Sequence, residues 1–132
     1  MIEFLFIGEK AQDTPLIIIR NLTPLGASQI AAAVRPLSLG TASAVDLSEL
    51  SAFASENVGT FSARIGVRDS GLRPVPGTEN DFECALKPST WDEVVGLLEP
   101  FTVETGRGAA HTHAYLSRHG PVMWLVSTDS AW

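Results

Sequence analysis

The stretch from Ala110 to Trp132 constrains the fold of this 132-residue chain more than any other segment. It holds two runs rich in β-branched and aromatic residues, and between them lies the tetrapeptide Arg118-His-Gly-Pro121. Gly120 can adopt a positive φ at no steric cost, and Pro121 can begin a strand but cannot lie inside one. The stretch therefore predicts a β-hairpin.

The second strand of this hairpin is apolar on both sides. Val122, Trp124 and Val126 point to one side, while Met123 and Leu125 point to the other. A strand that is buried on both faces lies inside a sheet rather than at its edge. We therefore expect a central strand here, with Trp124 among the most buried residues.

Length and composition indicate a globular domain. The chain fits one domain spanning residues 1–132, and its hydrophobic share of 45% is too high for a disordered protein. The longest apolar runs, Phe4–Ile7 and Leu16–Ile19, are far shorter than the ~20 residues that cross a bilayer. Because Cys84 is the one cysteine and no secretory signal is visible, we expect a cytoplasmic protein with no membrane partner.

Two pairs of strands are expected upstream of the hairpin. Residues 2–7 and 16–19 predict an antiparallel pair. Strict alternation of apolar and polar residues over 61–68 and 81–87 predicts two more strands that pair with each other. The connection between them, residues 69–80, is rich in glycine and proline and is expected to be a loop. In the second pair, Arg64 or Arg68 should lie near Glu83.

Three helices are expected, each from a capping residue followed by an apolar stripe. Proline and glycine mark where they stop. The first begins at Thr23 and Pro24 and ends at Pro36, the second runs from Asp46 to Asn57–Gly59, and the third begins with a Thr90–Glu93 capping box and ends at Pro100.

This order of elements does not alternate strand and helix as a parallel sheet requires. It predicts a single α+β domain with one mixed or mainly antiparallel sheet of about five to six strands. The three helices should lie mainly on one face of that sheet.

The charges are distributed unevenly along the chain. The formal net charge is −6, and no lysine or arginine occurs between Arg35 and Arg64 or between Lys87 and Arg107. Both intervals contain acids, so they are either solvated helix faces or a negative surface for a basic partner. The nine basic residues are scattered, which disfavours binding to nucleic acid.

All three histidines lie in the carboxyl-terminal stretch. His111 and His113 would project to the same side of a strand, and His119 could fold back from the turn as a third ligand of one metal ion. The alternative is a set of half-exposed histidines on a sheet. A metal-binding protein or metal-dependent enzyme is thus a second hypothesis for function.

No other catalytic set is apparent, and we expect a protein that is not an enzyme and has no cofactor. Cys84 lies on the apolar side of its strand, where a buried thiol is inert. The carboxylates Asp69, Glu79, Asp81 and Glu83 could form an acid–base pair, but nothing in the sequence fixes their separation, and we expect them to belong to a solvated loop.

The sequence predicts a small acidic α+β domain without a catalytic set. Two of its segments are a predicted helix that begins with tryptophan, Trp91 to Phe101, and the final stretch Ser127 to Trp132. In this style the chain resembles the immunity proteins of bacterial polymorphic and contact-dependent toxin systems. The resemblance covers the last third of the chain. It implies a cytoplasmic protein that binds and blocks one cognate toxin, often a basic nuclease, through an acidic surface.

The residues expected to contact such a toxin are acids, together with an aromatic residue that would be either a lid on the core or part of the interface. They are Asp46, Glu49, Glu56, Asp69, Glu79, Asp81 and Trp132.

Overall fold

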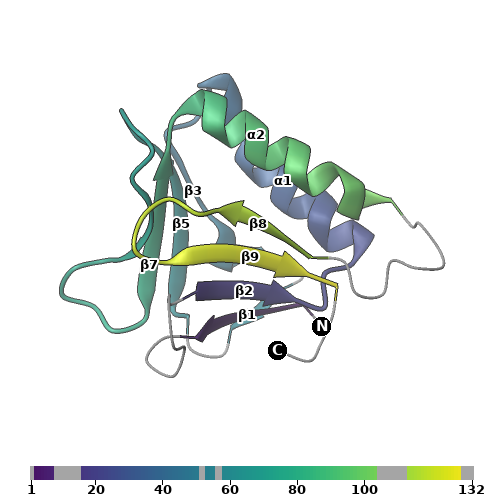
Figure 1. Cartoon of the computed structure of the whole chain (residues 1–132), viewed down its shortest axis with the longest axis horizontal. Helices are drawn as coiled ribbons and strands as arrows, with labels where there is room; N and C mark the ends of the chain where they lie inside the picture. Colours follow the sequence, from purple (N-terminus) through teal and green to yellow (C-terminus); the bar gives the residue numbers. More distant parts are fainter. Residues whose placement is uncertain (1, 8–15, 51–52, 56–57, 104–112, 129–132) are drawn as a thin grey trace.

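Two mixed sheets and two α-helices form the described part of the molecule (Figure 1). The computed structural model describes residues 2–7, 16–50, 53–55, 58–103 and 113–128, with residues 2–7 and 53–55 described by their backbone. The elements are β1 (Ile2–Ile7), β2 (Leu16–Arg20), α1 (Pro24–Leu39), β3 (Ala44–Asp46), the 3₁₀ helix η1 (Leu47–Glu49), β4 (Phe53–Ser55), β5 (Thr60–Ile65), β6 (Gly71–Pro74), β7 (Asp81–Leu86), α2 (Pro88–Leu98), the 3₁₀ helix η2 (Glu99–Thr102), β8 (His113–Ser117) and β9 (Met123–Ser127).

The first sheet, called sheet A, has the strand order β4-β1-β2-β9-β8. The predicted antiparallel pairs β1–β2 and β8–β9 are both confirmed. Strand β9 also pairs in parallel with β2, where Leu16 lies opposite Met123. The central position predicted for the last strand is therefore confirmed, and Trp124 and Leu125 are both fully buried.

The second sheet, called sheet B, has the order β3-β5-β7-β6. Strands β5 and β7 pair as predicted, but they run parallel, with Ala63 opposite Cys84. The connection expected to be a loop contains β6, which pairs antiparallel with β7 from the other side. A parallel pair cannot be joined by a tight hairpin, and the long connection between β5 and β7 provides the required crossover.

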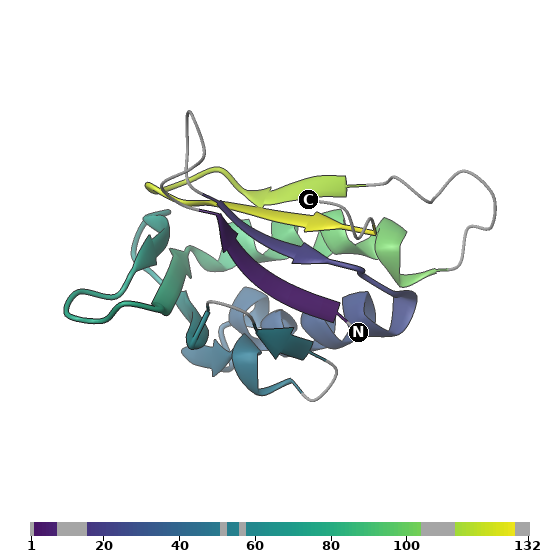
Figure 2. The same ribbon diagram turned by 90° about the horizontal axis from the view of Figure 1, so that it is seen from below.

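The expectation of a single sheet is wrong, although the α+β class is confirmed. In Figure 1 the strands of sheet B stand steeply to those of sheet A, and α1 and α2 cover one face of sheet A. The view from below in Figure 2 shows sheet A in front of both helices. Splitting the strands between two sheets lets the inner faces of both pack on one core.

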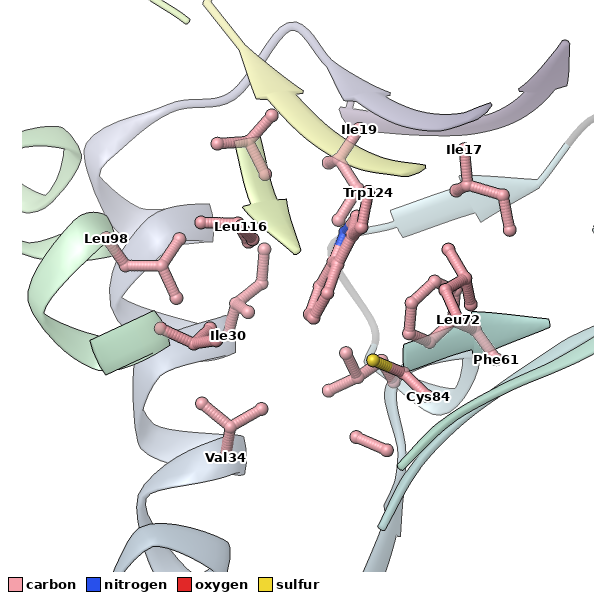
Figure 3. Packing of buried hydrophobic residues seen from close by; sticks show 14 of the residues in the cluster. Ile17, Ile19, Ile30, Val34, Phe61, Leu72, Cys84, Leu98, Leu116 and Trp124 are labelled. Carbon is pink, nitrogen blue, oxygen red and sulfur yellow. The ribbon is translucent and has the colours of Figure 1, made fainter. Parts of the chain in front are cut away.

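The core joins the two sheets to the helices. Trp124 of β9 contacts the ring of Phe61 in β5 with centroids 4.9 Å apart and that of Trp91 in α2 at 6.2 Å. Figure 3 shows Trp124 lying between the helix residues and the inner side of sheet B. Trp91 also donates a hydrogen bond from Nε1 to the carbonyl of Arg64, at 2.9 Å. Each fully buried side chain of this size contributes roughly 1.5–3 kcal/mol.

The two sheets are also joined through their backbones. Leu72 of β6 accepts a hydrogen bond from Val122 N at 3.1 Å and donates one to the carbonyl of His119 at 3.3 Å. Gly71 and Gly120 face each other at this junction, with φ values of 80° and 79°. A Cβ atom on Gly71 would lie 2.0 Å from the carbonyl oxygen of His119. Both positions therefore require glycine.

The helix predicted between Asp46 and Asn57 is wrong. Asp46 does cap a helix, because its carboxylate accepts a hydrogen bond from Ser48 N at 2.9 Å, but that helix is the single turn η1. The chain then continues into β4, which pairs in parallel with β1. Long-range backbone pairing therefore replaces a local apolar spacing that also fits a helix.

The first helix begins as predicted but does not end at Pro36. Thr23 Oγ1 accepts a hydrogen bond from Gly26 N at 3.1 Å, and the helix continues to Leu39. It stops at Gly40, which has a φ of 73°. The extra turn buries Leu37 completely, and this burial offsets the cost of a proline in the helix interior.

The last helix begins one turn earlier than predicted. Pro88 occupies its first position, and Lys87 is the N-cap without a side-chain cap hydrogen bond, so the Thr90–Glu93 capping box is wrong. Its predicted apolar stripe is confirmed, because Trp91, Val94, Val95 and Leu98 are all buried. Neither α1 nor α2 combines the length and the apolar character that crossing a membrane needs.

Candidate protein-binding surface

The structure brings four of the predicted acids to one end of sheet B. Asp46 lies opposite Ser62, and Thr60 lies opposite Asp81, so both aspartates occupy the outer face of the sheet where β5 and β7 begin. Glu49 lies in η1, three residues after Asp46, and Glu79 lies two residues before Asp81. We call Asp46, Glu49, Glu79 and Asp81 the acidic end of sheet B.

The acidic end presents its charges to solvent. Glu49 and Glu79 are exposed, and the two aspartates are half-buried. Two strand spacings and two residue rises separate Asp46 from Asp81, a distance of about 12 Å. This exceeds the Debye length of about 8 Å at physiological salt, so mutual repulsion between them is largely screened.

The centre of the same face is neutralised internally, which sets it apart from the acidic end. Glu83 of β7 forms ion pairs with Arg64 at 3.1 Å and with Arg73 at 3.0 Å. The predicted proximity of Arg64 to Glu83 is confirmed, and Arg73 joins because its segment is a strand. In the ranges that the structure describes, the four carboxylates of the acidic end form no ion pair.

Asp69 lies away from the acidic end, near the opposite end of β7. Its carboxylate accepts a hydrogen bond from Lys87 N at 2.9 Å. Partial burial acts to raise the pKa of Asp69, but hydrogen bonds from Lys87 N and Thr90 and the charges of Lys87 and His119 lower it overall. The length of β7 separates Asp69 from Asp81, so the structure does not bring these two predicted contact residues together.

The remaining predicted contact residues, Glu56 and Trp132, lie outside the described residues, as does His111. The other two histidines occupy opposite ends of β8. His113 begins the strand, opposite Ser127, and His119 lies two residues beyond its end. The five-residue strand β8 lies between them, and among the described residues no group of three or more His, Cys, Asp or Glu side chains is placed to hold a metal ion.

The one thiol is buried and protonated. Cys84 is fully buried on the inner face of sheet B, as expected from the sequence, and burial raises the pKa of its thiol despite a hydrogen bond with Ser117. A neutral thiol in an apolar setting is a weak nucleophile. Cys84 therefore serves the core rather than chemistry.

One surface was missed in the sequence. The exposed side of α1 carries Leu25, Ser28, Ala32, Arg35 and Leu39, and two of these are large apolar residues that are 67% and 68% exposed, Leu25 and Leu39. The sequence signal that could have identified this exposed side is its scarcity of charge, because the sixteen residues of α1 include one charged residue, Arg35. A solvated helix normally carries charged or polar residues at such positions.

Comparisons with protein-family models, with curated proteins and with solved structures returned no match.

Proposed function

We propose that this chain is a non-enzymatic binding protein of the immunity type, which neutralises a basic, nuclease-like toxin through the acidic end of sheet B. The observation that carries the proposal is a cluster of four carboxylates without ion-pair partners in the described chain, beside a glutamate that has two. The proposal places the protein in the cytoplasm, where its one buried thiol stays reduced.

The electrostatics of the acidic end suit capture of a basic protein. Four unneutralised negative charges on one end of a sheet attract a positive surface over about one Debye length and raise the association rate. Such steering acts on the rate of encounter, while buried contacts determine how long the complex lasts. Asp46 and Asp81 lie at strand ends and Glu49 lies in η1, so these three acids are held in place before the partner arrives, while Glu79 lies in the bend before β7.

The experiment begins with the reading frame next to the gene for this chain. We expect its product to stop cell growth when expressed alone and to be harmless when this chain is co-expressed. The purified pair should associate rapidly at low salt and more slowly as salt rises. A neighbouring product that is not toxic, or that does not bind this chain, contradicts the proposal.

Two matched double variants locate the surface. Glu49→Lys with Glu79→Lys reverses two charges at the acidic end, and Glu93→Lys with Glu99→Lys makes the same change in net charge on α2 and η2. We expect the first pair to slow association at least tenfold at low salt and to flatten its salt dependence. The second pair should change the rate less than threefold. Equal effects of the two variants would contradict the assignment of the surface.

A further inference from the structure

The outer face of sheet A, which points away from α1 and α2, is apolar along its middle. Successive side chains of a strand alternate between the two faces, and Ile17 and Ile19 of β2 belong to the core on the helix side. Ile18 therefore points to the outer face, as does Leu125 of β9, which lies opposite it. Tyr115 of β8 lies opposite Leu125 and continues this row across the sheet.

Ile18 and Leu125 are fully buried, although none of the described elements packs on this face. Both side chains are 0% exposed, and neither belongs to the core cluster between the sheets and the helices. Figure 2 shows β2 and β9 in front of the helices, with no strand or helix of another layer in front of them. A side chain in the middle of a sheet stands out from it, so neighbours on the same face do not cover its tip. Residues outside the described ranges therefore cover these two side chains.

Burial on the outer face increases toward the end of β9. Met123 at the start of the strand is half-buried, Leu125 is fully buried, and Ser127 is 1% exposed although it is polar. In the parallel neighbour β2, Leu16 lies opposite Met123 and is also half-buried. The cover thus lies over the second half of β9, close to the point where the chain continues toward residues 129–132.

Residues 129–132 have both the chemistry and the reach to cover this part of the face. Among residues outside the described ranges, Met1 and Trp132 have large apolar side chains. Met1 precedes β1, which lies beside β2 on the side away from β9, whereas Trp132 follows β9 itself. Leu125 lies about 10 Å before the last residue described after β9. The four following residues extend at most about 14 Å, so a turn within them brings the indole back over Leu125.

We infer that the outer face of sheet A binds residues 129–132, with the indole ring of Trp132 lying over Ile18 and Leu125. The ring is then the lid of a second apolar layer, on the opposite side of the sheet from the main core. Without this lid, Ile18, Leu125 and Tyr115 would form an exposed apolar patch, which favours association between copies. The inference does not depend on the proposed function, because the acidic end of sheet B contains none of these residues.

NMR spectroscopy of isoleucine methyl groups tests the contact directly. In the full chain, Trp132→Ala should shift the δ1 methyl signal of Ile18, because an aromatic ring changes the magnetic field at a methyl group packed against it. Ile17 and Ile19 are the matched controls, since they flank Ile18 and are equally buried but point to the other face. Their signals should move much less. An Ile18 signal that stays in place, or that moves no more than the two controls, overturns the inference.

A double-mutant cycle in thermal unfolding gives a second test. Trp132→Ala should lower the melting temperature of the natural chain, and it should lower that of Ile18→Ala by less than half as much, because the contact is already lost there. Ile19→Ala is the matched background, with the same side chain removed from the opposite face of the same strand. Trp132→Ala should keep its full effect in that background. Equal effects in the Ile18→Ala and Ile19→Ala backgrounds would place the ring elsewhere and overturn the inference.

Binding of the neighbouring toxin separates this inference from the proposed function. Trp132→Ala should leave the association rate with the toxin unchanged, whereas Glu49→Lys with Glu79→Lys should slow association. If Trp132→Ala slows association while the Ile18 methyl signal stays in place, Trp132 is an interface residue and the inference is overturned. If the methyl signal shifts as expected but no toxin binds the chain, the proposed function alone fails.

Discussion

The inner and outer faces of sheet B come from the same strands and have opposite character. On the inner face, Ala63, Cys84 and Leu72 lie side by side across three strands, and each is fully buried. One residue along, Ser62, Glu83 and Arg73 form the matching row on the outer face, where the arginine is half exposed. The alternation of the strands separates residues that determine stability from residues that are available for contact with a partner.

This difference indicates where substitutions should lower the free energy of unfolding most. Apolar contacts of the inner face are close-packed and cannot be replaced by water, whereas the charges of the outer face exchange protein partners for water at little cost. Substitutions should therefore cost most in the core, less at the junction of the sheets and at the buried thiol, and least on the outer face.

Trp124→Ala should have the largest effect, because it removes the ring that joins sheet A to Phe61 and Trp91. We expect a loss of about 3–5 kcal/mol in the free energy of unfolding, measured by denaturant titration. Trp124→Phe should cost less than half as much, since it keeps most of the contact and removes an indole N–H with no hydrogen-bond partner in the described chain. Equal costs would place the indole outside the core.

Gly71→Ala should come next, because it disrupts the junction between the sheets rather than a side-chain contact. The positive φ alone costs about 1–3 kcal/mol for alanine, and the added Cβ must also displace the backbone of His119 and Gly120. Gly96→Ala in α2 is the matched control, because nothing lies within 4 Å of its Cβ position. It should stabilise the protein by about 0.5–1 kcal/mol. Thermal unfolding should show a lower melting temperature for Gly71→Ala and a higher one for Gly96→Ala than for the natural chain.

Cys84 should make stability depend on pH in the alkaline range. Burial raises the pKa of the thiol in the folded state, so the folded protein keeps a proton that the unfolded chain loses above about pH 8.5. The stabilisation is fully present below that pH and declines by about 1.4 kcal/mol per pH unit above it, until the folded-state pKa is reached. The slope between pH 8 and 10 should be smaller by this amount in Cys84→Ala. An identical slope would mean that the thiol ionises in the folded protein.

Glu83→Gln should have the smallest effect, although it breaks two ion pairs. Both arginines are about half exposed, at 52% and 53%, and pairs of this kind contribute about 0.2–1 kcal/mol. We expect a loss within that range that diminishes in high salt. Glu79→Gln, which removes one charge from the acidic end, should leave stability unchanged. A loss above 2 kcal/mol for Glu83→Gln would mean that the outer face supports the fold.

The parts of the fold that were predictable carry a strong local pattern. The alternation around Ala63 and Cys84 identified both strands and their pairing, and the apolar faces around Trp124 identified the central strand. The relative direction of paired strands was not predictable, because the alternation of apolar and polar residues is the same in parallel and antiparallel pairs. The end of α1 was predicted wrongly at Pro36 because a local pattern was again insufficient. A proline inside a helix is destabilising, but the burial of Leu37 outweighs this cost.

The surface was harder to predict than the core. Spacing along the chain could not show that Asp81 lies at the end of sheet B that holds Asp46 while Asp69 lies at the other, since strand pairing decides this. The predicted histidine set shows the same limit, because the bulge and turn after Tyr115 determine where His119 lies. Charge counts along the chain show where the acids are, but they do not show which acids become neighbours in the fold.

The parallel pairing of β2 with β9 has a consequence for synthesis on the ribosome. The strand that completes the centre of sheet A follows β2 by more than a hundred residues, so β2 emerges long before its partner exists. Until then Ile17, Ile18 and Ile19, all fully buried in the finished fold, have an open backbone edge beside them. Contacts so distant in sequence form slowly. Nascent chains halted before β9 should therefore be the species that chaperones hold and that aggregates when chaperones are scarce.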